Sequence, residues 1–427
     1  MKIWIDVLGC PKNEADSESL EAILVNKGHE IVKDLEDADV AVINTCAFVS
    51  DAKKESVDEI LDLVNYKNQK DIKVVVHGCL TQRYFKEIRK EIGEIDAILG
   101  VVPPLRIAQA IEDLEDFNGP PQPVYEFLGR IIGEKPYAYV KIGDGCDRKC
   151  AFCAIPSIKG PLKNRGYDDI LEEINFLVRN GKKEIILVSQ DSTSYAYKGK
   201  NFIDLLKAID DIEGDFWIRL LYLYPDGVNE DLVMTVANSK KILHYFDIPL
   251  QHASAKILKL MRRNPDIESV KRKISFIRSK MPDAIFRTAF IVGFPQEEEA
   301  DFEELLQFID EMKFDRVGAF VYSDEEGTES YTLNPKVKKS VARLRFNRLL
   351  ERQQEISLER NRKLVGMNFK TLVEGFENGM YFGRTYMDAP EIDGLVYISS
   401  SKPVKIGSFV NVKVKSFEFY DLEGDLQ

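Results

Sequence analysis

The chain has 427 residues, of which 44% are hydrophobic and 30% are charged, so it is long enough to form two or three domains with real cores. No apolar run approaches the length of a membrane-spanning helix, which excludes a protein of that kind. The 71 acidic side chains outnumber the 59 basic ones and give a net charge of −12, which repels polyanions such as RNA on average, although many cytoplasmic proteins are acidic for solubility alone.

The N-terminus, MKIWIDVLGC, begins directly as a strand and lacks the charged and then apolar segments of a signal peptide. We therefore expect a cytoplasmic protein with no membrane association. Six cysteines in a chain of this length suit metal sites better than disulfides.

The N-terminal region contains three apolar runs that each end in a cysteine: IWIDVLGC in Cys10, VAVINTC in Cys46 and VVVHGC in Cys79. Helix-like stretches at residues 16–26 and 51–66 separate the runs, and this alternation predicts an α/β domain with a parallel sheet. Because ligands bind at the carboxyl edge of such sheets, the three thiols should face one crevice and share a metal. The alternative, three small buried hydrophobes, is disfavoured by the polar or turn-forming neighbours of all three.

This first domain should cover residues 1–118, because NGPPQP disrupts both helix and strand and marks a linker over residues 119–135. Strands follow from Tyr137 onward, and they alternate with helical stretches at residues 168–179, 202–209, 255–261 and 299–312. Six strands in this alternation predict a partial (β/α) barrel within residues 136–365. After the first strand, the others are EIILVSQ, FWIRLLYLYP, YFDIPLQ, AIFRTAFIVGFP and RVGAFVYS. Active residues of such a barrel lie on the loops at the carboxyl ends of its strands.

The first of these loops contains GDGCDRKCAFCAIP, in which three residues separate Cys146 from Cys150 and two separate Cys150 from Cys153. Three thiolates on one short loop can hold three irons of a cubane iron–sulfur cluster and leave the fourth iron open to a substrate or cofactor. A structural zinc site is the alternative, but it needs a fourth protein ligand, and all four histidines lie far away in sequence.

The cysteine segments carry a family resemblance. The loop around Cys150 resembles the cluster loop of radical S-adenosylmethionine enzymes, and Phe152 matches an aromatic residue common there. LGCPKNEADSE, NTCAF and HGCLTQRY resemble the N-terminal cluster segments of one such family, the methylthiotransferases, and the match spans almost the entire chain. The resemblance implies S-adenosylmethionine as cofactor and two 4Fe-4S clusters. Their implied ligands are an N-terminal trio (Cys10, Cys46 and Cys79) for the auxiliary cluster and a loop trio (Cys146, Cys150 and Cys153) for the radical cluster.

Polar residues of the barrel strands are candidates for contact with the cofactor. Gln190 follows the second strand and can bind the cofactor or cap the next helix, whereas Arg219 and Arg287 lie within later strands. The two arginines can either pair with the carboxylate of S-adenosylmethionine or neutralise a buried acid. The structural role, neutralising a buried acid, is favoured. IVGFPQE resembles a family segment in which glycine usually follows the proline, and Gln296 replaces that glycine here.

Residues 336–363 carry ten basic and three acidic side chains in a helix-like pattern that includes Val341, Leu344 and Ile356. An amphipathic helix docked on the barrel is favoured over a nucleic-acid-binding stripe. From residue 366 to 427 short strands and turns predict a small OB-like β-barrel, and GRTYMDAPEIDG resembles the TRAM domain. We expect its aromatic residues to lie largely in its core: Phe376, Tyr381, Tyr386, Phe417 and Tyr420.

TRAM domains commonly bind RNA. Residues 371–427, however, hold nine acidic and five basic side chains, a balance that suits a basic protein partner better.

Two branches of the methylthiotransferases share their chemistry, so the fold cannot separate them. One modifies an adenosine in transfer RNA, and the other modifies the β-carbon of an aspartate in small-subunit ribosomal protein S-twelve. LGCPKN, CAIPSIKG, VSQDSTSY, IPLQHAS and VYSDEEGT resemble the ribosomal-protein branch. The resemblance therefore implies an aspartate methylthiotransferase, with one S-adenosylmethionine supplying the methyl group and another supplying the radical that takes hydrogen from the β-carbon.

We further expect a monomer that needs an electron donor and a sulfur source and contacts RNA only through the ribosome. Two alternatives stay open at this point. One is a transfer-RNA-modifying member of the same family, and the other is a non-catalytic, metal-stabilised RNA-binding protein.

Overall fold

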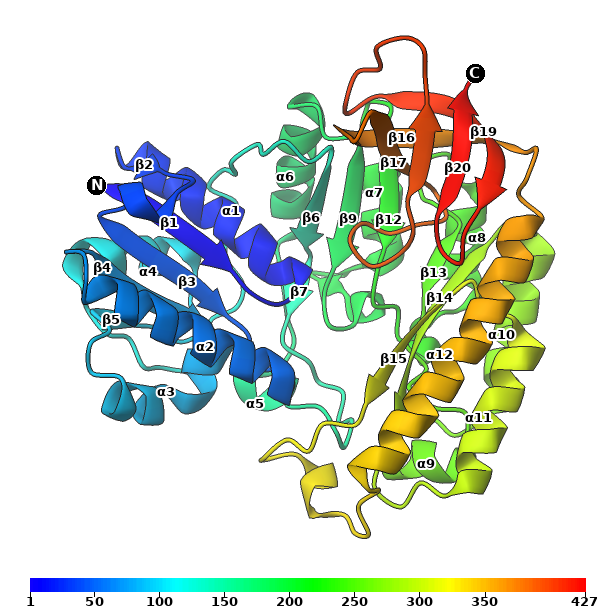
Figure 1. Ribbon diagram of the computed structural model, residues 1–427, viewed down its shortest axis with the longest axis horizontal. Helices are drawn as coiled ribbons and strands as arrows, with labels where there is room; N and C mark the ends of the chain where they lie inside the picture. The colour runs from blue at the N-terminus through cyan, green and yellow to red at the C-terminus, as the bar shows by residue number, and fades with distance from the viewer.

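The N-terminal domain is built on a five-stranded parallel sheet, in a computed structural model that describes residues 1–427 (Figure 1). The strand order is β2-β1-β3-β4-β5, with β1 (Lys2–Val7), β3 (Val40–Thr45) and β4 (Lys73–Gly78) in the middle and β2 (Glu30–Ile31) and β5 (Ala97–Ile98) at the edges. The three predicted strands and their parallel pairing are confirmed.

Helices cover both faces of this sheet, because residues that alternate along β3 are apolar on both sides. Val40 and Val42 pack against α1 (Pro11–Asn26) and α4 (Pro104–Asp113). Ala41 and Ile43 pack on the other face, against α2 (Ser50–Lys67) and α3 (Cys79–Glu91).

The central domain is a partial barrel of six parallel strands, as predicted. It consists of two three-stranded sheets, ordered β12-β9-β6 and β13-β14-β15, which one isolated bridge between Ile218 and Ile242 connects. The strands are β6 (Tyr137–Lys141), β9 (Glu184–Val188), β12 (Trp217–Leu220), β13 (Tyr245–Asp247), β14 (Ile285–Val292) and β15 (Arg316–Val321). Short two-stranded ribbons are formed by β7 (Gly143–Asp144) with β8 (Lys163–Asn164) and by β10 (Ala196–Tyr197) with β11 (Lys200–Asn201).

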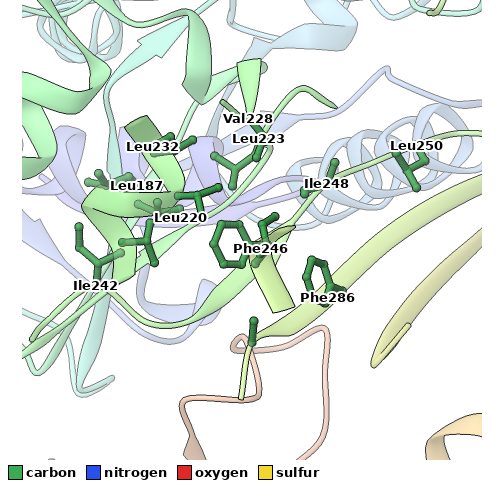
Figure 2. Close-up of a cluster of buried hydrophobic side chains, with 14 of the residues drawn as sticks. Leu187, Leu220, Leu223, Val228, Leu232, Ile242, Phe246, Ile248, Leu250 and Phe286 are labelled. Atoms are coloured by element: carbon green, nitrogen blue, oxygen red, sulfur yellow. The ribbon is translucent and has the colours of Figure 1, made fainter. Parts of the chain in front are cut away.

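Helices line the outside of the barrel and bury its outward-facing residues, among them Leu187, Leu220 and Phe246 (Figure 2). They are α6 (Tyr167–Arg179), α7 (Phe202–Asp210), α8 (Glu230–Asn238), α9 (Ala255–Leu260), α10 (Ile267–Lys280) and α11 (Glu299–Met312). Helix α5 (Ile155–Lys159) lies instead at the boundary with the N-terminal domain, where it packs against α3. The sequence analysis did not predict α8 and α10. Their N-caps were the available signal, because Asn229 and Asp266 each accept a hydrogen bond from a backbone amide three residues on.

The basic segment forms α12 (Lys339–Arg362), which packs against β15 and α11, so the docked helix is confirmed. Its arginines face acids on and before α11, as in the pair of Arg345 with Glu297 at 2.9 Å. The predicted apolar pattern is wrong at Leu344, whose exposed fraction is 58%, whereas Leu349 and Ile356 are buried.

The C-terminal domain is a closed five-stranded barrel in the order β16-β17-β18-β20-β19, as predicted. Its strands are β16 (Asn368–Glu377), β17 (Met380–Thr385), β18 (Val396–Ser399), β19 (Phe409–Phe417) and β20 (Leu422–Leu426). The expectation of core aromatics holds only in part, because Phe376 and Tyr420 are exposed. No helix anywhere in the chain has the length and apolarity needed to cross a membrane.

The C-terminal barrel closes the amino-terminal end of the central barrel (Figure 1). Glu184, at the start of β9, is fully buried and binds Arg219 at 2.5 Å and Arg384 of the C-terminal barrel at 2.6 Å. Trp217 packs on Phe409 with ring centroids 4.6 Å apart. The carboxyl ends of the central strands are therefore left to face the N-terminal domain.

Candidate functional site

The N-terminal trio lies at the carboxyl edge of the first sheet. Cys10 caps α1, Cys46 follows β3 directly, and Cys79 begins α3. Gly9 has a φ of +97°, and a Cβ at this position would lie 2.9 Å from Cys46 Sγ, so only glycine lets the Cys10 loop approach Cys46 this closely. Burial raises the pKa of Cys79 to about 12, and its neighbours Cys10 and Cys46 act in the same direction. The fold thus places all three cysteines at one edge of the sheet.

Hydrogen bonds from neighbouring side chains fix the loops that carry these thiols. Ser56 Oγ lies 3.0 Å from both the amide nitrogen and the carbonyl oxygen of Cys46. Asn13 Nδ2 donates to the Leu8 carbonyl at 2.7 Å, and Thr45 Oγ1 donates to the His77 carbonyl at 2.7 Å. These hydrogen bonds therefore hold the loops on which Cys10, Cys46 and Cys79 lie.

The loop trio is held by a compact turn after β7. The Cys153 amide donates to the Cys150 carbonyl at 3.1 Å, and the Arg148 amide donates to Cys146 Sγ at 3.4 Å. Arg263 reaches the loop from the barrel, with Nη1 3.7 Å from Cys150 Sγ. Burial raises the pKa of Cys153 to about 12 and also raises that of Cys146.

All six cysteines are free thiols, and each trio offers three of them, the donor set that suits an iron–sulfur cluster with one open iron. Nowhere in the chain do three histidine, cysteine or carboxylate side chains converge on a point that one ion could occupy.

The two trios adjoin each other across the domain boundary. Helix α5, which begins two residues after Cys153, packs against α3, and Cys79 lies in one apolar cluster with Ala154 and Ile158. The N-terminal domain and the central barrel therefore meet where α3 packs against α5, next to Cys79 of one trio and just after Cys153 of the other.

Two lysines that the sequence analysis did not single out lie at this junction. Lys12 Nζ is 4.9 Å from the centroid of the Tyr222 ring, and Lys159 Nζ is 3.4 Å from Asp144 Oδ2. Both lysines are buried. The signal was present in the sequence, because Lys12 lies in LGCPKN and Lys159 in CAIPSIKG, two of the segments singled out for the family branch.

The predicted cofactor contacts are placed as follows. Phe152 packs beside the loop trio against Ile257, Met261 and Phe294. Gln190 does lie at the carboxyl end of β9, where its Nε2 donates to Asp144 Oδ1 at 2.5 Å and its Oε1 is buried without a partner.

The two arginines adopt the alternative that the sequence analysis favoured. Arg219 neutralises the buried Glu184 at the opposite end of the barrel, and Arg287 binds Asp247 at 2.9 Å. The geometry therefore favours a structural role for both over contact with S-adenosylmethionine.

Left-handed backbone conformations mark the strand ends of the barrel. Tyr222, Gln251 and Gln296 have φ values of 58°, 74° and 67°, which cost energy for residues other than glycine and cluster at functional sites. Gln296 stands where the family segment usually has a glycine, and a glycine would adopt this left-handed conformation without strain.

An acidic cavity of about 520 Å³ opens beside the N-terminal trio and reaches Cys10. Lys135 is the one basic residue of its lining, and it bridges Glu14 at 3.0 Å and Glu391 at 2.6 Å. Burial raises the pKa of Glu21 to about 7, and the neighbouring Glu18 contributes. The acids that line the cavity are Asp6, Glu14, Glu18, Glu21 and Glu391.

The chain matches three known families in succession. Residues 2–100 match the uncharacterized protein family UPF0004, residues 140–309 the radical SAM superfamily and residues 365–426 the TRAM domain. It is 50% identical to a protein of Thermotoga maritima over 100% of both chains. It is also 50% identical to one of Thermosipho africanus, over 100% of this chain and 99% of the relative. Both relatives are named ribosomal protein uS12 methylthiotransferase RimO.

Solved structures share the fold at much lower identity. The radical S-adenosylmethionine methyltransferase TsrM of Kitasatospora setae superposes with a TM-score of 0.57 at 12% identity, covering 88% of this chain and 79% of that one. The cobalamin-dependent enzyme OxsB superposes with a TM-score of 0.52 at 12% identity, covering 83% of this chain and 56% of that one.

Proposed function

Since the chain belongs to the RimO family of ribosomal protein uS12 methylthiotransferases and is a radical SAM enzyme, we propose that it transfers a methylthio group to the β-carbon of an aspartate in uS12. The observation that carries this proposal is that the two cysteine trios, one from each α/β domain, both adjoin the contact between α3 and α5. One trio would suffice for making a radical. A second trio beside it suits an enzyme that also inserts sulfur.

We propose that the loop trio and the N-terminal trio each hold one 4Fe-4S cluster, and that S-adenosylmethionine binds at the loop trio. When bound, these groups supply the electron, the radical that removes hydrogen from unactivated carbon, and the sulfur with its methyl group. The chain's own residues bind and orient them and exclude water from the space between the trios. Arg263, beside Cys150, places a positive charge next to the loop trio.

The charge of the molecule supports this choice of substrate. The acidic cavity that begins at Cys10 is formed by α1, the linker before β6 and the C-terminal barrel, and its lining holds five acids and one lysine, with Arg130 behind it paired to Glu18. Such a surface attracts a basic protein and repels the phosphates of transfer RNA. An electron donor and a sulfur source are also required, and we propose that the enzyme acts as a monomer in the cytoplasm.

Reconstituted, reduced enzyme is incubated with S-adenosylmethionine, sulfide and either purified uS12 or transfer RNA, and each product is analysed by mass spectrometry. The proposal predicts a methylthio mass gain on one aspartate of uS12 and none on the RNA. A gain on the RNA alone would assign the chain to the other branch of the family. Stoichiometric zinc in place of iron in the purified protein would refute catalysis altogether.

A further inference from the structure

One loop of the central domain binds the N-terminal domain through a buried acid. It is the segment of residues 323–330, drawn in yellow after β15 in Figure 1. Glu325 in this segment has an exposed fraction of 2%. A glutamate is almost never fully buried unless a cation pairs with it. Both cations that pair with Glu325 come from the N-terminal domain, so the loop and that domain hold each other in place.

The contacts of Glu325 join the loop to two helices. Its Oε2 accepts from Lys53 Nζ on α2 and from Arg83 Nη1 on α3, at 2.7 Å each. We call Glu325 with these two cations the clasp. Arg83 Nη2 also donates to the Glu326 carbonyl at 2.7 Å. The clasp therefore holds the N-terminal halves of α2 and α3 to a single segment of the central domain.

Each end of the segment is bonded to a residue that directly follows a cysteine. Arg83 Nη1 donates at 3.1 Å to the carbonyl of Ala47, the residue after the second cysteine of the N-terminal trio. At the other end, the Ser330 amide donates at 2.8 Å to the carbonyl of Ala151, the residue after the second cysteine of the loop trio. Hydrogen bonds thus connect the two trios through this segment.

Further hydrogen bonds stiffen the segment between its two ends. Thr328 Oγ1 donates to the Glu325 carbonyl at 2.7 Å and lies 3.3 Å from Ser330 Oγ. Tyr322 donates its hydroxyl proton to the same Ser330 oxygen at 2.8 Å. Because the segment is bonded internally, the clasp at one end sets where the other end lies.

We propose that Glu325 is a positioning residue that fixes the N-terminal trio relative to the loop trio. This inference rests on the proposed function, in which hydrogen is removed at one trio and sulfur is supplied at the other. A misplacement of about 1 Å between reacting groups can slow a reaction about a hundredfold. Cleavage of S-adenosylmethionine takes place at the loop trio and does not depend on that distance. Loss of the clasp should therefore leave cleavage intact and reduce its use for methylthiolation.

The experiment measures how much deoxyadenosine the reconstituted enzyme forms for each methylthio group that it transfers to uS12. It compares wild type with Glu325→Ala, Glu325→Gln and Glu325→Asp. Glu329→Gln is the matched control, because Glu329 lies in the same segment but pairs with Arg262 of the central domain, at 2.7 Å. Iron content and deoxyadenosine formation without uS12 are measured in parallel.

Amide hydrogen exchange provides a readout that does not depend on activity. It is measured by mass spectrometry on the full chain before the clusters are reconstituted. The peptide of interest contains Ser50, whose amide donates to Ser323 Oγ at 3.1 Å across the domain boundary, beside the clasp. Exchange in this peptide reports whether the segment still holds the start of α2.

We expect Glu325→Ala and Glu325→Gln to form about ten times more deoxyadenosine per methylthio group than wild type, with iron content and formation without uS12 within about twofold. Glu325→Asp, which keeps the charge, should give an intermediate ratio, and Glu329→Gln should match wild type. Exchange in the Ser50 peptide should be about tenfold faster in Glu325→Ala and unchanged in the control.

A wild-type ratio in both Glu325→Ala and Glu325→Gln would overturn the inference. Loss of iron from both, or faster exchange throughout the chain, would also overturn it, because Glu325 would then support the fold and not a distance. If wild type forms deoxyadenosine but never modifies uS12, the proposed function fails, and the exchange comparison alone decides whether the clasp joins the domains.

Discussion

Replacing Glu184 with glutamine should loosen the C-terminal barrel from the central one. The Glu184 carboxylate is fully buried and serves two guanidinium groups, Arg219 at 2.5 Å and Arg384 at 2.6 Å. Burial alone would raise the pKa of Glu184, but these two cations hold it below the ordinary value. Removing one partner of a buried ion pair costs about 3–5 kcal/mol, and glutamine keeps one accepting oxygen, so we expect a loss of about 3 kcal/mol in the free energy of unfolding.

The assay uses the contact between Trp217 and Phe409 at the same seam. The chain has two tryptophans, so a Trp4→Phe background makes Trp217 the only one, and its fluorescence during urea denaturation reports separation of the barrels. Glu374→Gln is the matched control, because Glu374 also binds Arg384, at 3.0 Å, but leaves Glu184 in place. We expect that control to cost about 1 kcal/mol. A loss below about 1 kcal/mol for Glu184→Gln would refute the view that this buried network holds the seam.

Three further predictions concern pH, backbone strain and the cysteines. Burial lowers the pKa of His77 and His252 to about 3. An unfolded histidine takes up a proton below a pH of about 6.5, whereas these two stay neutral in the folded protein down to a pH of about 3. The free energy of unfolding should therefore fall as the pH is lowered through this range, by about 2 kcal/mol for each histidine between neutral pH and pH 5. Urea midpoints that do not fall between neutral pH and pH 5 would contradict this. Gln296→Gly should raise the free energy of unfolding by about 1 kcal/mol, because it relieves a left-handed φ of 67°; a lower urea midpoint would speak against it. Cys150→Ala should abolish cleavage of S-adenosylmethionine, whereas Cys46→Ala should leave cleavage partly intact and block methylthiolation. Cleavage is measured by chromatography of deoxyadenosine, and methylthiolation by mass spectrometry of uS12. Methylthiolation that survives in Cys46→Ala would refute the assignment of Cys46 to the auxiliary cluster.

The sequence was sufficient for the parts of the site that follow from local patterns. Cys10, Cys46 and Cys79 are far apart along the chain, but each follows an apolar run, and parallel strands present their carboxyl ends at one edge. The spacing of Cys146, Cys150 and Cys153 is itself local. The position of both trios in the fold is therefore predictable from the amino-acid sequence.

The charges around the trios could not be predicted in this way, since their meaning depends on contacts between distant segments. Arg219 becomes a structural residue because Glu184 and Arg384, from another strand and another domain, reach it. Glu325 becomes notable because both of its cationic partners belong to another domain. Leu344 fits an apolar helical pattern, yet the neighbours of α12 bury the adjacent face of the helix instead.

The central claim is that each cysteine trio holds its own cluster in one enzyme. Iron and sulfide analysis of anaerobically reconstituted protein, with Mössbauer spectra to identify the cluster type, tests it most directly. We predict about eight irons per chain in two cubanes, and about four in a variant with alanine at all three N-terminal cysteines. About four irons in the intact protein, unchanged in that variant, would contradict the claim.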